Sequence, residues 1–361
     1  MPPLRRFLGP LHLLPPPARR AGGAALLIAL PLLTGCDRPP EMQRLAGQAQ
    51  GTDYRVLWWR EGDNRLPALR TDLSQTLAEI DRELSTYRDD AWISRFNRSR
   101  TTDWQAAPAS ALHLLGIARE VHARSQGCFD PTVSPLFALW GFQDQNFRVP
   151  SDEEIERTLS QTGLEHLEID AENGRLRKQH ETLSIDLSAM GEGYSVDRIA
   201  SALEARGIEN YLAELGGDMR LRGTKADGTP WRVGIERPTA GTRRAATLVT
   251  LDDARDASIN TSGTYRRFFD DNGHLYSHIL DPRTGHPVEH DLVSATVFGE
   301  SADAARSDAW ATALLCLGRS KGMAAAEREG LATLLTERRG EAFESFQSPA
   351  LRESDRVTLS Q

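Results

Sequence analysis

The stretch SIDLSAMGEGYSVDRIA, Ser184–Ala200, passes from an alternating run through a glycine-containing loop directly into a helical pattern. From Val196 onward apolar residues recur every three or four positions, so we expect an amphipathic helix that ends at Gly207. Asp186 and Glu192 stand on either side of the loop. Their carboxylates could hydrogen-bond a polar ligand, or they could cap a strand end and complement the helix dipole. A loop of this kind can also turn its carbonyls toward a cation while the helix N-terminus faces an anion.

Outward from this loop, the pattern predicts mainly helices on the N-terminal side and mainly strands on the C-terminal side. Helical spacing is found at 69–85, 109–125 and 301–317, and a shorter helix ends at 330. Ser151, with Glu154 three residues later, predicts a capping box at the start of a further helix. Strands are expected at 211–215, 231–235, 246–251, 274–280, 292–298, 331–336 and 342–346. Because no internal repeat is found between 51 and 348, this span is interpreted as one α+β unit.

The N-terminus has the order of parts of a secretory signal. Four arginines precede an apolar run at 24–33, which leads into Leu-Thr-Gly-Cys ending at Cys36. This ending resembles the lipobox of bacterial lipoproteins, which are cleaved before the cysteine and acylated on it; an uncleaved membrane anchor is the alternative. Asp37 resembles the enterobacterial signal for retention in the inner membrane, which would place the domain on the periplasmic side. The expected parts are a signal peptide at 1–35, a lipidated tether at 36–50, a domain at 51–350 and a C-terminal tail at 351–361.

Charge and cysteine content exclude some classes of protein. The chain has 43 basic and 51 acidic residues, and removing residues 1–35 removes four arginines and no acidic residue, which leaves 39 basic residues and a net charge of −12. Such a surface is unsuited to nucleic acid. Besides Cys36 the chain contains only Cys128 and Cys316. They permit one disulfide, although two buried free thiols are the favoured prediction.

The segment SDAWATALL, Ser307–Leu315, places Asp308 and Thr312 four residues apart on a predicted helix. Residues at this spacing project from the same face. A carboxylate and a hydroxyl are hard oxygen donors, which suit Mg²⁺. The alternative interpretation is that the pair lies on a solvated helix face without a ligand. The carbonyl of Ala189, in the glycine-containing loop, is a candidate for a further cation ligand.

Two other segments carry groups that could act on a ligand. In GCFDPTVSPLFALWGF, 127–142, the pair Asp130-Pro131 predicts a turn between aromatic residues, which are either core or the lining of a slot for a flat heterocycle. In YSHILDPRTGHP, 276–287, His278 leads into a turn. It is either structural or, beside the hydroxyl-rich segment 261–263, a group for proton transfer or phosphate contact.

Eight segments in series resemble the ApbE family, the FAD:protein FMN transferases. They are GQAQGTDYRV (47–56), LSTYRDDAWISRFN (84–97), GCFDPTVSPLFALWGF (127–142), IDLSAMGEGYSVD (185–197), LGGDMRLRG (215–223), INTSGTYRRFF (259–269), SHILDPRTGHP (277–287) and SDAWATAL (307–314). The resemblance extends from Gly47 to about Pro349. It implies an α+β, T-fold-like domain in which a sheet packs against helices, forming a single globular unit.

The resemblance also implies roles for individual residues. Contacts to FAD would fall on Gln50, Tyr87, Cys128, Phe129, Asp130, Asp186, Glu192 and Leu280. Mg²⁺ would be held by the side chains of Asp308 and Thr312 and at the Ala189 and Ala311 positions, and His278 matches a histidine tied to activity. The chain departs from the family pattern at Gln50, where Met is usual, and at Cys128, where Ala or Gly is common.

The implied reaction is a phosphoryl transfer. The hydroxyl of a Thr or Ser on a target flavoprotein would attack the FMN-side phosphorus of FAD, and AMP would leave, with Mg²⁺ neutralising charge on the pyrophosphate. Implied targets are inner-membrane subunits of Na⁺-pumping NADH:quinone reductases or Rnf-type complexes, and similar periplasmic flavoproteins. The alternatives are an Mg²⁺-dependent FAD pyrophosphatase that gives FMN and AMP, and a non-catalytic lipid-anchored flavin-binding protein.

Overall fold

The computed structural model describes residues 40–62, 67–239, 244–252, 255–265, 268–271, 273–300 and 303–360. The expected signal peptide and Cys36 lie outside these ranges. Within the described residues, no helix combines the length and the apolar character that crossing a bilayer requires.

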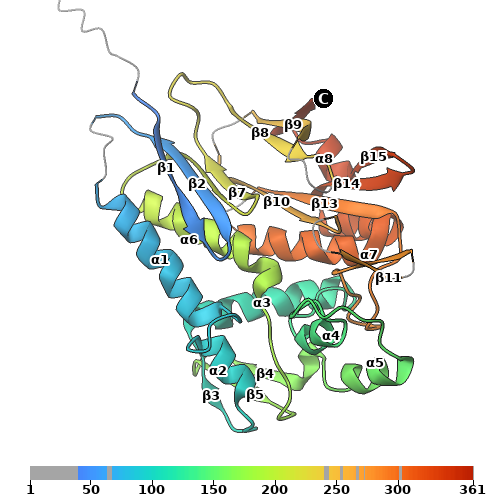
Figure 1. Cartoon of the computed structure of the whole chain (residues 1–361). Coiled ribbons are helices and arrows are strands. Elements are labelled where there is room, and N and C mark those ends of the chain that lie inside the picture. The colour runs from blue at the N-terminus through green and yellow to red at the C-terminus, as the bar shows by residue number, and fades with distance from the viewer. Residues whose placement is uncertain are drawn as a thin grey trace, which may run out of the picture. The chain divides into compact units, whose positions relative to one another are not determined.

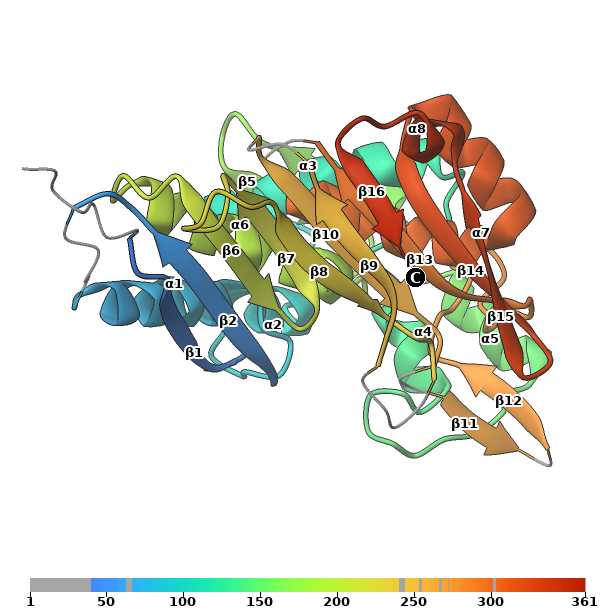
Figure 2. The same cartoon turned by 90° about the horizontal axis from the view of Figure 1, so that it is seen from above.

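An eight-stranded antiparallel sheet forms the centre of the domain (Figure 2). Its strands, in spatial order, are β1 (Gln43–Ala49), β2 (Thr52–Trp59), β6 (Asn210–Leu215), β7 (Asp218–Arg222), β10 (Ala257–Gly263), β13 (Leu292–Gly299), β14 (Ala332–Arg339) and β15 (Ala342–Gln347). The strands lie in chain order across the sheet. The N-terminal hairpin of β1 and β2 therefore forms one edge, and the C-terminal hairpin of β14 and β15 forms the other.

Different layers cover the two faces of this sheet (Figure 1). One face carries α6 (Gly191–Glu204) and α7 (Ala304–Glu329), and the other carries a three-stranded sheet of β8 (Trp231–Glu236), β9 (Ala245–Leu251) and β16 (Val357–Ser360). Side-chain alternation along β7 and β10 explains both contacts. Met219, Leu221 and Ile259 belong to the apolar core shared with the smaller sheet. Arg220 and Ser258 point the other way and hydrogen-bond residues of α6 and α7.

The remaining elements lie around these layers. They are α1 (Leu69–Leu84), α2 (Trp92–Arg98), α3 (Ala109–Arg124), α4 (Ser134–Leu139), α5 (Asp152–Leu159), α8 (Pro349–Arg352), the 3-10 turns η1 (Leu164–His166) and η2 (Ser188–Met190), a small sheet of β3 (Gln105–Ala106), β4 (Leu167–Asp170) and β5 (Arg175–Lys178), and a hairpin of β11 (Phe268–Asp271) and β12 (His274–Ser277). The largest apolar core lies between the central sheet and α1, α3, α6 and α7.

Most of the elements expected from the sequence are confirmed, and the fold class is α+β as expected. The capping box is present, because the Ser151 side chain accepts from the Glu154 N–H and the Glu154 carboxylate accepts from the Ser151 N–H. The two last helices, expected separately, form the single element α7 with a break at Gly318, where φ is +71° and ψ is 174°.

The expected boundaries of the domain are wrong at both ends. Gln43–Ala49, expected in the tether, is strand β1 and pairs along its whole length with β2. Val357–Ser360, expected in the tail, is strand β16 and pairs with β9. Both are edge strands in which most side chains stay exposed or half-buried; β1 has one buried side chain, and β16 is only four residues long, too short for a clear pattern.

The two cysteines were expected to be free thiols, and this prediction is also wrong. Cys128 and Cys316 form a disulfide, with their Cα atoms 5.7 Å apart and the two residues separated by 188 positions in the chain. Both are almost fully buried. The bond joins the segment before α4 to the middle of α7, so it spans two regions that sequence proximity does not connect.

Candidate functional site

The glycine-containing loop opens into α6 directly against α7. The backbone N–H of Gly193, in the first turn of α6, donates to Oδ2 of Asp308 over 3.1 Å. A Cβ atom at Gly193 would lie 2.4 Å from the carbonyl oxygen of Ala304 and 2.8 Å from Cβ of Asp308, closer than real Cβ atoms approach other atoms. Glycine at 193 is therefore required for α6 to approach α7 closely enough to reach Asp308.

Three carboxylates from three elements meet at this contact. Asp308 of α7 is 7% exposed, and burial raises its pKa well above the ordinary value, with Asp218 and Glu192 raising it further by their charge. Asp218 is 3% exposed, and its Oδ1 accepts from the backbone N–H of Thr261 over 3.1 Å. Glu192 lies over Gly216, where φ is +67° and a Cβ would fall 2.2 Å from a Glu192 carboxylate oxygen. We call Glu192, Asp218 and Asp308 the acidic cluster.

Asp218 was not among the residues singled out from the sequence. The signal was present in the Gly-Gly-Asp of 216–218, where two glycines with positive φ precede an aspartate buried at the start of a strand. A buried carboxylate is expensive unless a cation or hydrogen bonds compensate it, so a strand that begins with one is a candidate for ligand binding.

Thr312 follows Asp308 by one helical turn, as expected, and its Oγ1 lies 3.0 Å from Oγ of Ser262. The hydroxyl-rich segment 261–263 therefore meets α7 at this turn. Ala311 is fully buried beside Thr312, and Ala189 lies in η2, which packs against α7. Carboxylate, hydroxyl and carbonyl oxygens are the ligands that Mg²⁺ prefers, and the concentration of buried negative charge is what a divalent cation would offset. The residues present fit such an ion.

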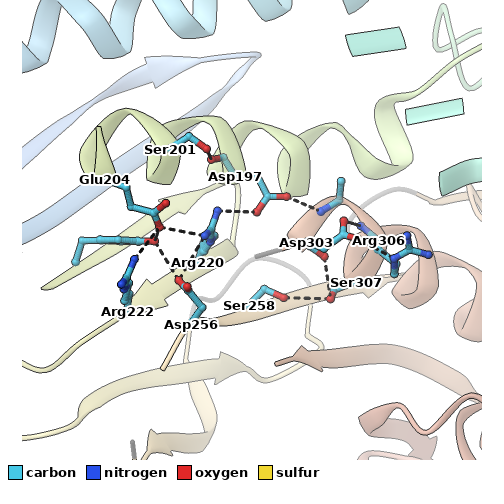
Figure 3. Close-up of polar contacts among 12 residues, drawn as sticks. Asp197, Ser201, Glu204, Arg220, Arg222, Asp256, Ser258, Asp303, Arg306 and Ser307 are labelled. Carbon is cyan, nitrogen blue, oxygen red and sulfur yellow. Dashed lines mark hydrogen bonds and ion pairs between the residues drawn. The ribbon is translucent and has the colours of Figure 1, made fainter. Parts of the chain in front are cut away.

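A polar network fixes α6 and α7 relative to the sheet (Figure 3). The guanidinium of Arg220 on β7 is 3% exposed and contacts Glu204 at 3.1 Å and Asp197 at 3.4 Å, both on α6. The other oxygen of Asp197 accepts from the N–H of Ala305, over 3.1 Å, in the first turn of α7. Because Asp197 binds both partners, this network sets the distance between the two helices that carry Glu192 and Asp308.

Gln50 and Asp186, both expected to contact FAD, lie next to the loop. Gln50 occupies the turn between β1 and β2 with φ of +54°, and its Oε1 accepts from Oγ of Ser195 on α6 over 3.0 Å. Oδ1 of Asp186 accepts from the N–H of Ser188 over 2.9 Å, which closes a local turn before η2; within the described residues no strand ends at Asp186. The N–H of Asp186 donates to the carbonyl of Pro131 over 2.7 Å, so segments 130–132 and 186–188 adjoin.

In the 127–142 segment, the residues expected to contact FAD also make contacts within the domain. Both carboxylate oxygens of Asp130 are engaged: Oδ1 accepts from the N–H of Thr132 over 2.8 Å and Oδ2 from the N–H of Leu164 over 3.1 Å. Phe129 is buried in the largest core. Cys128, as part of the disulfide, has no thiol to offer a ligand.

The remaining expected residues lie on other parts of the domain. Tyr87, after α1, is 83% exposed, so its ring is free to meet a ligand. Leu280 is 5% exposed and belongs to a small core with Trp140, whose Nε1 donates to the carbonyl of Gly285. His278 follows β12 directly and is half-buried. The structure thus brings the glycine-containing loop, the acidic cluster, Thr312 and Gln50 together. The other residues expected to contact FAD, among them Tyr87 and Leu280, lie on separate segments of the domain.

Comparisons with known proteins agree with this architecture. The ApbE family model matches residues 50–335. The FAD:protein FMN transferase of Salmonella typhimurium is 38% identical over 338 residues, covering 90% of this chain and 95% of its own, and that of Vibrio cholerae is 36% identical over 329 residues, covering 90% and 96%.

Solved structures give the same result. The flavin transferase ApbE from Vibrio cholerae superposes with a TM-score of 0.77 at 35% identity, covering 87% of this chain and 99% of that one. The apo form of the Pseudomonas stutzeri flavinyl transferase ApbE superposes with a TM-score of 0.78 at 36% identity, covering 87% and 96%. Because the family model matches most of the chain and the solved structures share its fold, this chain belongs to the ApbE family.

Proposed function

We propose that this protein transfers the FMN moiety of FAD to the hydroxyl of a Thr or Ser on target proteins and releases AMP. The observation that carries the proposal is the joining of the acidic cluster to the first turn of α6 through the Gly193–Asp308 hydrogen bond. It places cation-binding oxygens beside the positive end of a helix dipole, and both features favour a pyrophosphate. The curated relatives are named for this activity.

Mg²⁺ is the cation that the donor set suits. The side chains of Asp308 and Thr312 and the backbone positions Ala189 and Ala311 would hold it. When bound, it would supply positive charge for the phosphate oxygens of FAD as the phosphoryl group is transferred.

The chain's own residues would bind and orient FAD. The N-terminal turn of α6 would direct the positive end of its helix dipole toward the phosphates. Asp186 precedes that turn and Glu192 lies within it, and both would hydrogen-bond the nucleotide. The further contacts proposed are those at Gln50, Tyr87, Cys128, Phe129, Asp130 and Leu280; at Cys128 the contact would come from backbone or disulfide atoms.

The transfer step is balanced by one bond formed and one broken. The acceptor oxygen forms a bond to the FMN-side phosphorus, the bond from that phosphorus to the bridging oxygen breaks, and AMP leaves with that oxygen. The proton of the acceptor hydroxyl goes to His278 or to solvent. His278 acts either as this base or as a contact to the transferring phosphate.

We also propose that Cys36 carries a lipid anchor that holds the domain at the periplasmic side of the inner membrane. The support is the order of parts in residues 1–37. The proposed acceptors are subunits of ion-pumping redox complexes and similar flavoproteins that expose their target segment on that side.

The test uses the full chain, purified in a mild detergent because residues 24–33 are apolar. It is mixed with FAD, Mg²⁺ and an acceptor bearing Asp-Gly-x-Ser/Thr-Gly-Ala-Thr, and intact mass and AMP release are measured. The expected result is an acceptor heavier by one FMN phosphoryl group, with no gain when its last Thr is replaced by Ala or when EDTA is present. AMP and free FMN with an unlabelled acceptor would identify a pyrophosphatase, and FAD bound unchanged would identify a carrier.

A further inference from the structure

Asn260, near the middle of β10, has a fully buried side chain with unmet hydrogen-bonding capacity. Its exposed fraction is 0%, and neither Nδ2 nor Oδ1 has a hydrogen-bond partner among the residues that the structure describes. Burying an amide without hydrogen-bond partners destabilises a fold. A native fold that retains such a group needs a reason for it.

The neighbours of Asn260 along the strand show which way its side chain points. Oγ of Ser258 donates to Oγ of Ser307 over 3.1 Å, which Figure 3 shows, and Oγ of Ser262 lies 3.0 Å from Oγ1 of Thr312. Alternate side chains of a strand lie on the same face. Asn260 therefore faces α7 between these two contacts, opposite the turn that begins at Asp308.

The pairing of β10 with β7 places Asn260 beside a second acid. Ile259 pairs with Met219 in the antiparallel register, so continuing by one residue sets Asn260 opposite Asp218. The hydrogen bond from the Thr261 N–H to Oδ1 of Asp218 confirms that the two strands remain adjacent there. Asp218 on the strand side and Asp308 on the helix side thus flank the Asn260 carboxamide.

We propose that Asn260 is a positioning residue of the cation site. Its Nδ2 hydrogens donate to the carboxylates of Asp218 and Asp308 when a cation is bound, and hold them in the arrangement that binds Mg²⁺. A carboxamide suits this place because it donates hydrogen bonds without adding a further negative charge to the acidic cluster. The inference rests on the proposed metal site, and it concerns a residue to which that proposal gives no part.

The experiment is a calorimetric titration of the full chain with Mg²⁺ alone, in wild type and in Asn260→Leu. Loss of a group that orients metal ligands weakens metal binding by about 10- to 100-fold, and this increase in Kd is the expected result. The apo variant should unfold at the same or a higher urea concentration than wild type, because Leu removes a buried amide without partners. A purely structural role would change the unfolding midpoint and leave the Kd for Mg²⁺ unchanged.

Ser258→Ala is the matched control, because Ser258 lies on the same face of the same strand and bonds α7 away from the acidic cluster. Its Kd for Mg²⁺ should remain within about twofold of wild type, on the scale of one neutral hydrogen bond that does not touch the ligands. Asn260→Ala, which introduces no clash, replaces Asn260→Leu if the larger side chain prevents folding. An unchanged Kd in either Asn260 variant overturns the inference while leaving the metal site intact. Absence of Mg²⁺ binding in wild type overturns the metal assignment itself, and the inference with it.

Discussion

Replacing Gly193 by Ala should separate α6 from α7 at the acidic cluster. The added Cβ would lie 2.4 Å from the Ala304 carbonyl oxygen and 2.7 Å from its carbon. An ordinary carbon–oxygen contact is about 3.2 Å or longer, so the two helices must move apart by roughly 0.8 Å or distort. Both neighbouring atoms belong to the backbone, which yields less readily than a flexible side chain. The movement would also lengthen the 3.1 Å hydrogen bond from the Gly193 N–H to Asp308.

The expected cost of Gly193→Ala is about 1 to 3 kcal/mol in the free energy of unfolding, the range for overpacking a well-packed interior. Gly191→Ala is the matched control, because Gly191 lies in the same turn with helical φ and ψ, and a Cβ there meets nothing within 4 Å. That change should be neutral or stabilising by about 0.5 kcal/mol, since Ala loses less backbone entropy in a helix.

The assay is urea unfolding of both variants and of wild type, followed by far-UV circular dichroism at one temperature. The two glycines differ in their surroundings and little in their backbone conformation, so the comparison isolates the contact with Ala304. Equal unfolding midpoints for Gly193→Ala and Gly191→Ala would refute the conclusion that close approach of α6 to α7 requires glycine at 193.

Three further changes test other parts of the structure. Asp308→Asn should lower AMP release by roughly 100-fold or more at saturating Mg²⁺; a full rate at limiting Mg²⁺ would contradict its assignment as a ligand. Replacing both Cys128 and Cys316 by Ala should lower the free energy of unfolding by about 2 to 5 kcal/mol, as expected for a bond closing a long loop, and an unchanged urea midpoint would count against the disulfide. Burial, with the charge of Arg100, lowers the pKa of Lys178 to about 8. The unfolded chain therefore binds more protons than the folded chain between pH 8 and 10.5. Wild type should gain up to about 3 kcal/mol in the free energy of unfolding across that range, relative to Lys178→Met. Parallel profiles of stability against pH for the two proteins would show that the Lys178 pKa is not lowered.

Short-range patterns account for what could be predicted of the helices. Helix α1 follows its apolar spacing, α5 begins at the Ser151 capping box, and α6 opens directly after the loop. In each case the interactions that define the element join residues within four positions of each other. The pair Asp308 and Thr312 belongs to the same category, because its geometry follows from helix periodicity alone.

Strands β1 and β16 could not be predicted in the same way, because a strand gains its hydrogen bonds from a partner elsewhere in the chain. Strand β1 has one fully buried side chain, Leu45, and it is a strand because β2 pairs with it. Strand β16 depends in the same way on β9. For the disulfide, no spacing rule connects two cysteines that lie 188 residues apart.

The sequence by itself thus determined the α+β class, helices α1, α3 and α6, the start of α5, the glycine-containing loop and the Asp308–Thr312 pair, since each rests on local periodicity or on a contiguous motif. Only the tertiary structure decided that Asp218 joins Glu192 and Asp308 and that Asn260 lies beside them. These side chains come from different strands and helices, and their meeting depends on strand register and on the close packing of α6 against α7. Such long-range contacts leave no periodic trace in the amino-acid sequence.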